Sequence, residues 1–169
     1  KRSISSGDSG IYGMAGLALQ LWLELPHKSR PAFEVHPGIS ALQVAASKIG
    51  APLMHDFCAI SLSDYLTDWD KIEKRLKAAS EGDFVVALYN PRSKNRDWQL
   101  QRALAIVLQH RSSTTPVLLA RQLGRSEEMI STFELGSFPI DKVDMLSFLL
   151  IGNSSTYGKD GYLITPRGY

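Results

Sequence analysis

The spacing of apolar residues predicts alternating helices and strands in the first part of the chain. Met14, Leu17, Leu21 and Leu25 recur every three to four positions, which predicts a buried helix over residues 12–25. A second helix is expected over residues 42–49, where apolar residues have the same spacing. Short strands are expected at residues 3–6, 33–36 and 57–62.

A different pattern follows a polar connector at residues 61–67. Trp69, Ile72, Leu76 and Ala79 form the apolar stripe of an amphipathic helix, and Gly82 ends it. A continuous apolar run at residues 84–89 is typical of a central strand that is buried on both faces. A further helix is expected at residues 97–110, and further strands are expected at residues 117–121, 129–135, 145–151 and 162–165.

The order of these elements predicts the fold class. Alternation of strand and helix in both halves indicates an α/β protein, and the late run of strands adds antiparallel character. We expect two domains, residues 1–62 as the remainder of an N-terminal α/β domain and residues 63–169 as a C-terminal α/β domain. The chain opens almost directly into a glycine-rich turn, so we expect that part of the N-terminal domain is missing.

Three loops, each expected to follow a strand, carry residues that let a backbone approach a ligand. They lie at residues 5–10, 37–41 and 89–94. Glycine permits close approach and a positive φ, and the N-terminus of a following helix offers free N–H groups. Ligands of open α/β sheets bind at the carboxyl ends of the strands. The three loops together predict a binding cleft, although each alone is compatible with ordinary turn chemistry.

Composition narrows the possible partners. The hydrophobic share of 44% and the charged share of 21% are typical of a globular protein, and a net charge of +2 gives no reason to expect nucleic acid. The longest nearly apolar stretch, residues 11–25, contains Gln20 and Glu24 and is too short to cross a bilayer, so no membrane partner is expected. Cys58 is the sole cysteine, which excludes an internal disulfide and is compatible with a cytoplasmic protein.

Several stretches resemble the tetrapyrrole (corrin/porphyrin) methyltransferases. The Ser-Gly-Asp turn at residues 6–8 is shared across that family, and the Tyr-Asn-Pro-Arg-Ser-Lys loop at 89–94 and the Thr-Pro-Arg-Gly-Tyr ending at 165–169 are more specific. The resemblance covers essentially the whole chain and is strongest to the branch that methylates C17 of precorrin-3B in cobalamin biosynthesis. Further similar stretches lie at residues 55–57, 60–64, 83–88, 124–125, 144–146 and 151–153.

The resemblance implies a two-domain tetrapyrrole methyltransferase fold, with S-adenosylmethionine bound in a folded form in the cleft between the domains. It also implies a homodimer, a tetrapyrrole substrate, release of S-adenosylhomocysteine and, for this branch, methylation at C17 with contraction of the ring. The family opens with a Gly-x-Gly-Pro-Gly turn that this sequence lacks, and it has proline where this chain has Ser9. We therefore expect an incomplete cofactor and substrate cleft.

The same resemblance implies which residues contact the cofactor. They are Gly7, Asp8, Ile11, Ser40, Ala41, Leu88, Tyr89, Asn90 and Gly124. Asp8 would accept hydrogen bonds from polar groups of the cofactor, and Ser40 and Ala41 would lie beside its methionine part. The segment 88–90 would offer backbone groups around the adenine. For Asp8 and Ser40 the alternative role is that of a helix N-cap.

The implied substrate is rimmed with carboxylates, which guanidinium groups bind well. The candidates are Arg92, Lys94, Arg96 and Arg167, with Arg121 and Arg125 as further ones, and a solvated basic surface is the alternative. His55 is the candidate acid–base group for ring contraction, with a structural histidine as the alternative. The sequence contains no His, Cys and carboxylate set with metal-ligand spacing, so we expect no metal site, and any cobalt would belong to the substrate.

Three functions are compatible with these residues. The first is C17 methylation of precorrin-3B, or of its cobalt form, with S-adenosylmethionine as the methyl donor. The second is methylation within the same superfamily at another precorrin position, or of siroheme, diphthamide or ribosomal RNA substrates. The third is a non-catalytic remnant that binds a tetrapyrrole or a partner protein. The loop at residues 89–94 and the ending at residues 165–169 favour the first.

Overall fold

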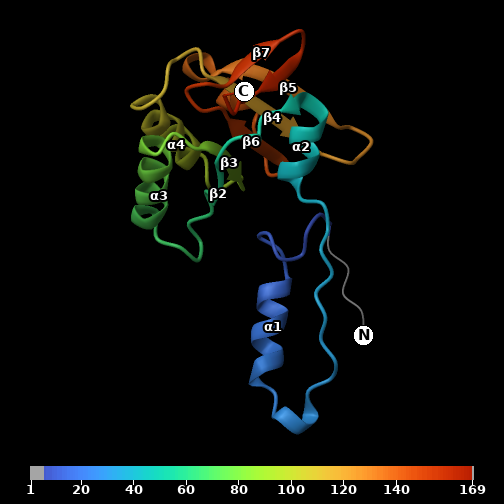
Figure 1. Ribbon diagram of the computed structural model, residues 1–169. Helices are drawn as coiled ribbons and strands as arrows, with labels where there is room; N and C mark the ends of the chain where they lie inside the picture. Colours follow the sequence, from blue (N-terminus) through green and yellow to red (C-terminus); the bar gives the residue numbers. More distant parts are fainter. Residues whose placement is uncertain (1–5, 169) are drawn as a thin grey trace. The chain divides into compact units, whose positions relative to one another are not determined.

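The computed structural model describes residues 6–168, and the chain divides into two compact units, Lys1–Gln43 and Val44–Tyr169 (Figure 1). We call them unit 1 and unit 2 and describe each by itself. Helices and mixed sheets together confirm the α/β fold class. The strand expected at residues 3–6 lies outside the described residues except for Ser6, and the expected domain boundary after residue 62 stays a prediction.

The helix expected at residues 12–25 of unit 1 is shorter than expected and not buried. α1 (Ala15–Glu24) begins after a series of turns at residues 9–14, in which Tyr12 has a φ of +51° and the Ala15 N–H donates to the carbonyl of Ser9 at 3.0 Å. The expectation of a buried helix is wrong, since α1 has no buried residue. Apolar spacing identifies a helix, but burial also requires a second element on its apolar face.

An extended segment, residues 30–39, returns along α1 in unit 1 (Figure 1). The strand expected at residues 33–36 is not formed, because a strand needs a neighbouring strand for its backbone groups. Side chains hold the segment instead. Trp22 of α1 donates from Nε1 to the carbonyl of Pro31 at 2.8 Å, and its ring centroid lies 5.7 Å from that of Phe33. Arg30 stacks over the same indole at 4.9 Å, and the short turn η1 (His27–Ser29) joins α1 to the segment.

Unit 2 is built on a five-stranded mixed sheet in the order β2-β3-β6-β4-β5. Its strands are β2 (Phe57–Ser61), β3 (Val85–Tyr89), β4 (Pro116–Arg121), β5 (Met129–Glu134) and β6 (Ser147–Ile151). β2 and β3 are parallel, and β6 runs antiparallel to both β3 and β4. Consequently β2, β3 and β4 all finish at one end of the sheet, which we call its carboxyl end. All five strands were predicted from the apolar pattern, to within two residues at each boundary.

The remaining elements within residues 6–168 are three helices, a small sheet and two short turns. They are α2 (Ala41–Ile49), α3 (Trp69–Glu81), α4 (Trp98–Leu108), the sheet β1-β8-β7 with β1 (Gly50–Ala51), β8 (Tyr162–Ile164) and β7 (Tyr157–Lys159), and the turns η2 (Leu135–Ser137) and η3 (Ile140–Lys142). The predicted helices and β8 are confirmed. β1 and β7 were not predicted, because two or three residues are too few to show an alternating pattern.

The core of unit 2 lies between α3, α4 and the five-stranded sheet, with the two helices side by side (Figure 1). Leu76 and Leu100 from the helices and Leu88 and Leu149 from the strands are fully buried. Each such side chain stabilises the fold by about 1.5–3 kcal/mol relative to an exposed one. β3 lies between β2 and β6 and is buried on both faces, so the predicted central strand is confirmed.

Candidate functional site

The carboxylate of Asp8 holds two turns of unit 1 together. Its Oδ1 accepts the N–H of Gly10 at 2.7 Å, and its Oδ2 accepts the N–H of Gly38 at 2.9 Å. These bonds, above all the one from Gly38, hold the pKa of Asp8 below its usual value because they stabilise the charged form. At neutral pH an ionised side chain therefore joins the turn at residues 7–10 to the turn at residues 37–41.

The two turns approach each other through glycine. Gly7 has a φ of +71°, a conformation that L side chains rarely adopt. A Cβ on Gly38 would lie 2.2 Å from the carbonyl oxygen of Gly7, and a Cβ on Gly7 would lie 3.9 Å from the Cα of Ser40. The structure thus brings together Gly7, Asp8 and Ser40, three of the residues expected to contact the cofactor.

Ser40 stands directly before α2, but its side chain does not cap that helix. Its N–H donates to Oε1 of Gln43 at 2.8 Å, whereas its buried Oγ has no hydrogen-bond partner among the described residues. Buried hydroxyl groups are normally bonded, so this one fits a hydrogen bond to a ligand. Ala41 begins α2, where free N–H groups are available. Ile11 follows the first turn, and its side chain is 40% exposed.

In unit 2 the expected cofactor residues lie at the carboxyl end of the sheet. Leu88 and Tyr89 finish β3, and the Tyr89 ring packs edge-on against Phe148 with centroids 5.1 Å apart. Asn90 follows with a φ of +50°, and its Nδ2 donates to the Oγ of Ser61, the last residue of β2, at 3.0 Å. The ends of two neighbouring strands are therefore tied together by side chains.

The turn after β4 lies at the same end of the sheet. Gln122 and Gly124 have φ values of +50° and +74°, and the Gln122 N–H donates to the carbonyl of Leu146 at 3.1 Å. The N–H of Gly124 donates to Oε2 of Glu128 at 2.6 Å. The structure thus places Gly124 and Asn90 at one end of the sheet. Glu128 was not among the expected site residues, and no local motif singles it out.

Two of the expected substrate-binding residues hold the loop that follows β3. Nη1 of Arg96 donates to the carbonyls of Leu62 and Asn90, to the former at 2.9 Å. Nη1 of Arg92 donates to the carbonyl of Ile140 at 3.1 Å. Burial lowers the pKa of the Arg96 guanidinium, which remains charged at neutral pH. Both side chains therefore shape this loop, whatever else they bind.

Three further expected residues are exposed and lie in different places. Lys94 belongs to the loop after β3, and Arg167 follows β8 of the small sheet. His55 precedes β2, so it lies at the amino end of that strand, opposite to the carboxyl end of the sheet. Its Nδ1 accepts the N–H of Asp56 at 2.8 Å. Within unit 2, the structure does not bring His55 together with Asn90 or Gly124.

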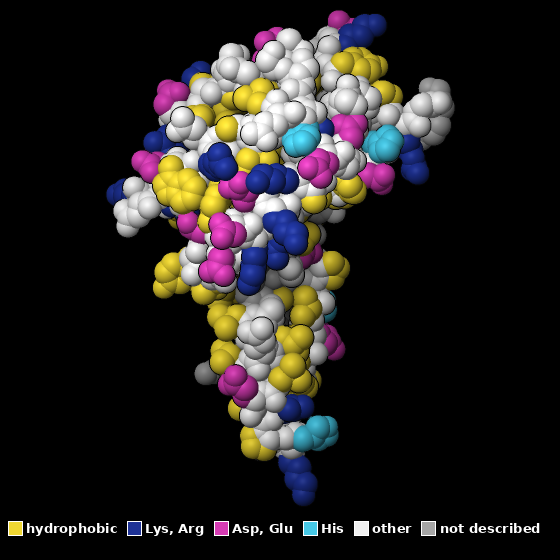
Figure 2. Space-filling model, turned by 90° about the vertical axis from the view of Figure 1, so that its left-hand side faces the viewer, with side chains coloured by type: hydrophobic (Ala, Val, Ile, Leu, Met, Phe, Trp, Pro, Cys, Tyr) yellow, Lys and Arg dark blue, Asp and Glu magenta, His cyan; other side chains and the backbone are white. Residues whose placement is uncertain are grey.

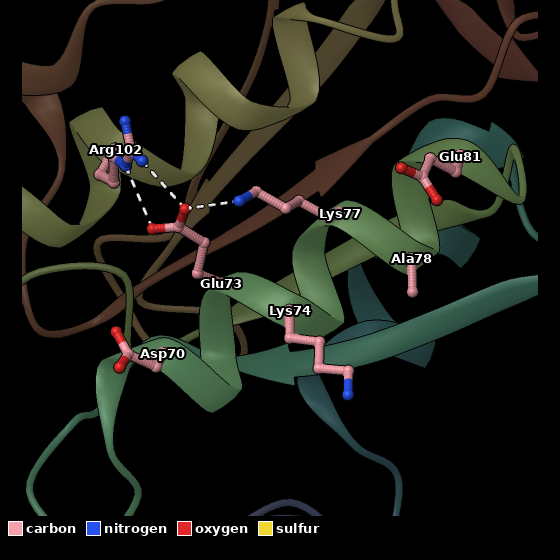
Figure 3. Close-up of a pocket in the computed structure, with 7 residues that line it drawn as sticks. All are labelled: Asp70, Glu73, Lys74, Lys77, Ala78, Glu81 and Arg102. Atoms are coloured by element: carbon pink, nitrogen blue, oxygen red, sulfur yellow. Dashed lines mark hydrogen bonds and ion pairs between the residues drawn. The ribbon is translucent and has the colours of Figure 1, made fainter.

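A charged pocket of about 670 Å³ lies on α3 and α4 (Figure 3). It is lined by Asp70, Glu73, Lys74, Lys77, Ala78, Glu81 and Arg102. Glu73 accepts hydrogen bonds from Arg102 at 2.9 and 3.2 Å and lies 2.9 Å from Nζ of Lys77; these contacts, that of Arg102 first, lower the pKa of Glu73 to about 2. Side chains of both charges are interspersed on this side of unit 2 (Figure 2). No expected site residue lines the pocket, and the ion pair of Glu73 with Arg102 joins α3 to α4.

Other centres of reactivity are few in residues 6–168. Burial raises the pKa of the Cys58 thiol to about 11, with Arg111 opposing, so the thiol is protonated at neutral pH and a poor nucleophile. This part of the chain contains no group of three His, Cys, Asp or Glu side chains arranged to hold a metal ion. None of its helices has the length and apolar character needed to cross a membrane.

Comparison with known proteins identifies the family of this α/β protein. The sequence profile of the Tetrapyrrole (Corrin/Porphyrin) Methylases matches residues 3–139, and the chain belongs to this family. A crystal structure of the methyltransferase CobJ superposes with a TM-score of 0.90 at 40% identity, over 96% of this chain and 68% of that one. The resemblance found in the sequence is therefore confirmed.

Relatives in this family carry more specific names. The chain is 51% identical to a probable cobalt-factor III C(17)-methyltransferase of Salmonella typhimurium, over 98% of this chain and 68% of the relative. It is 38% identical to a precorrin-3B C(17)-methyltransferase of Sinorhizobium sp, over the same two shares. A cobalt-factor III methyltransferase of Priestia megaterium is 48% identical, and the chain spans 31% of its length. The chain thus spans part of each relative.

Structures of methyltransferases named for other tetrapyrroles match less closely. The cobalt precorrin-4 methyltransferase CbiF has a TM-score of 0.64 at 17% identity over 86% of this chain and 61% of that one. A uroporphyrin-III C-methyl transferase from Thermus thermophilus, complexed with S-adenyl homocysteine, has a TM-score of 0.59 at 19% identity over 86% of this chain and 62% of that one. At these identities the likeness shows the fold alone.

Proposed function

We propose that this chain acts as an S-adenosylmethionine-dependent methyltransferase on C17 of precorrin-3B, or of cobalt-factor III, in cobalamin biosynthesis. One difference carries the proposal. The chain is 38–51% identical to relatives named for C17, whereas the structures named for precorrin-4 and uroporphyrin III are 17% and 19% identical. Methylation at another tetrapyrrole position therefore has weaker support, and so does a non-catalytic role.

The turns of unit 1 fit the polar groups of such a cofactor. S-adenosylmethionine, when bound, supplies a methyl group activated on a sulfonium. The buried Oγ of Ser40 would bond to it, as would the N–H groups at the start of α2 near Ala41. Asp8 uses one lone pair of each carboxylate oxygen on the turns and retains others for the cofactor. Gly7 and Ile11 would contribute the backbone and apolar surface of the first turn.

In unit 2 we assign the remaining cofactor contacts to backbone groups. The side chain of Leu88 belongs to the core, so its peptide groups are what it can offer. Tyr89 and Asn90 are held by Phe148 and Ser61, which fixes the backbone after β3. Gly124 would contribute from the turn after β4. Methyl transfer from a sulfonium needs orientation and exclusion of water more than a charged catalytic group, so rigid loops suit this reaction.

Basic residues would bind the carboxylates of the tetrapyrrole. Lys94 is exposed in the loop after β3, and Arg167 is exposed beyond β8. Arg92 and Arg96 donate from Nη1 to loop carbonyls, and each guanidinium has five N–H groups, so both can hold the loop and bind a carboxylate. His55 as the acid–base group of ring contraction stays a prediction.

The proposal includes the setting in which the protein works. Homodimer formation is taken from the resemblance to the family, and no partner chain is needed for the contacts described above. A cytoplasmic location is supported by the free thiol of Cys58, which suits a reducing compartment. Gel filtration with light scattering measures the oligomeric state, and fractionation of the source cells measures the location.

The test is incubation with S-adenosylmethionine and, separately, precorrin-3B, cobalt-factor III or uroporphyrinogen III, followed by mass spectrometry. We expect one added methyl group on precorrin-3B or cobalt-factor III, and S-adenosylhomocysteine as the second product. Methylation of uroporphyrinogen III alone would favour another position, and binding without methylation would favour the non-catalytic role. A version extended by the family's Gly-x-Gly-Pro-Gly segment is assayed in parallel, because that segment is expected to line the cleft.

A further inference from the structure

Glu128 links the turn after β4 to helix α2 within unit 2. Its Oε2 accepts the N–H of Gly124 at 2.6 Å, and its Oε1 lies 2.7 Å from Nζ of Lys48, in the last turn of α2. The side chain of Glu128 is 21% exposed, so it is held against the protein rather than free in solvent. A single carboxylate thus fixes a backbone N–H of the turn and also a lysine on a neighbouring helix.

The turn needs such support because its backbone is strained. Gln122 has a φ of +50°, which is uncommon for a residue with a side chain, and Gly124 has a φ of +74°. Residues persist in this region where their surroundings hold them. The Arg125 N–H donates to the carbonyl of Gln122 at 2.9 Å inside the turn, and Glu128 adds a bond to an ionised acceptor. Bonds to charged groups are roughly twice as strong as neutral ones.

We propose that Glu128 is a positioning residue for methyl transfer, which acts with Lys48 to hold the Gly124 turn in its cofactor-binding conformation. The inference rests on the proposed function. Glu128 does not contact the cofactor in this account. It occupies the N–H of Gly124, so the turn presents its other backbone groups to the ligand. Its pKa lies below the usual value, chiefly because of the Gly124 bond and then because of Lys48, so the link is present at neutral pH.

The two contacts of Glu128 differ in expected weight. Lys48 is 43% exposed, and exposed ion pairs contribute little, so we expect Lys48→Met to weaken S-adenosylhomocysteine binding by about two- to threefold. Glu128→Ala removes both contacts and leaves the Gly124 N–H without its acceptor, so we expect a loss of about tenfold or more. Glu128→Gln keeps an oxygen for Gly124 and should recover much of that loss. Glu127→Ala, at the adjacent position, is the matched control. It removes one contact to the turn, the bond that Glu127 Oε2 accepts from Nε2 of Gln122, which is long (3.4 Å) and exposed, so this variant should bind nearly like the wild type.

The test is calorimetric titration of S-adenosylhomocysteine into the wild type and these four variants, with thermal unfolding of each. The expected order of affinity is wild type and Glu127→Ala, then Lys48→Met and Glu128→Gln, then Glu128→Ala, at temperatures where all are folded. Equal affinity of Glu128→Ala and Glu127→Ala would overturn the inference and leave the proposed function standing. A folded wild type that does not bind would overturn both. If Glu128→Ala does not fold, a Glu128→Gln affinity equal to that of Glu127→Ala, with no effect of Lys48→Met, would overturn the inference.

Discussion

The carboxylate of Asp8 accepts the backbone N–H of Gly38 at 2.9 Å, across thirty positions of the sequence. The same side chain accepts the N–H of Gly10 at 2.7 Å, so one residue organises both turns of unit 1. An aspartate after glycine at the start of a turn was expected to contact the cofactor directly. The structure adds a structural role for Asp8, which is to hold the two turns together. Both turns can contact one ligand only if they lie side by side.

We expect the Asp8 link to survive mild acid. The pKa of Asp8 is lower in the folded protein than its ordinary value of about 3.9, so its contribution is complete above that value and is lost as the pH falls through the lower folded pKa. Amide hydrogen exchange of Gly38, followed by NMR, should therefore stay protected from neutral pH to about pH 4. Asp8→Ala should raise the exchange rate about tenfold at neutral pH. Unchanged protection in Asp8→Ala would show that the bond does not hold the turns.

Gly38→Ala should separate the two turns. The added Cβ would lie 2.2 Å from the carbonyl oxygen of Gly7, a backbone atom that must move, and such overpacking costs about 1–3 kcal/mol. Gly16→Ala is the matched control, because its Cβ meets no atom within 4 Å and alanine suits α1 better by about 0.5–1 kcal/mol. Thermal unfolding and S-adenosylhomocysteine affinity measure both. Equal behaviour of the two variants would contradict the close approach of the turns.

Glu73→Gln should reduce stability at neutral pH and lose its effect in acid. The pKa of Glu73 is lowered from 4.5 to about 2, first by the hydrogen bonds from Arg102 and then by Lys77. Ionised Glu73 with its partners therefore contributes its full stabilisation above pH 4.5, and this contribution declines as the pH falls towards 2. Urea unfolding at several pH values measures the difference from wild type. Glu81→Gln, which changes an exposed carboxylate on the same helix, is the matched control. A difference between Glu73→Gln and the wild type that grows in acid would have the wrong sign.

Cys58 should react slowly in the folded protein. Burial raises its pKa to about 11, so very little thiolate exists at neutral pH. Since Cys58 is the sole cysteine, Ellman's reagent reports on it alone. We expect slow labelling in buffer and rapid labelling in denaturant. Fast labelling of the native protein at the rate of the unfolded chain would show that β2 is open to solvent.

The fold of unit 2 was predictable where apolar patterns are long. Strand β3 was identified by its continuous apolar run, and helix α3 by its apolar stripe of Trp69, Ile72, Leu76 and Ala79. Side chains that pack on one core must recur at the spacing of their helix or strand, so long elements leave a clear pattern in the sequence. Unit 1 was predicted less well. The apolar residues of α1 have helical spacing, but whether they are buried depends on a second element that packs against them. Residues 33–36 form no strand because no neighbouring strand pairs with their backbone N–H and C=O groups.

The glycines of the candidate site could be predicted from the sequence, whereas the long-range contacts that hold its turns could not. Glycines in these loops indicate unusual backbone geometry. In the structure Gly7 and Gly124 have a positive φ, and Gly38 makes a close backbone contact. The bond of Asp8 to Gly38 and the ion pair of Lys48 with Glu128 join residues that are far apart in the sequence. Such pairs follow from the folded path of the chain, and no local motif encodes them.

If the turns at residues 7–10 and 37–41 bind S-adenosylmethionine, they should also bind its product, S-adenosylhomocysteine. S-adenosylhomocysteine is titrated calorimetrically into the wild type, Asp8→Ala and Gly16→Ala. We expect saturable binding of one molecule per chain to the wild type and Gly16→Ala, and much weaker binding to Asp8→Ala. No binding to a folded wild type, or equal binding to all three, would contradict binding at these turns.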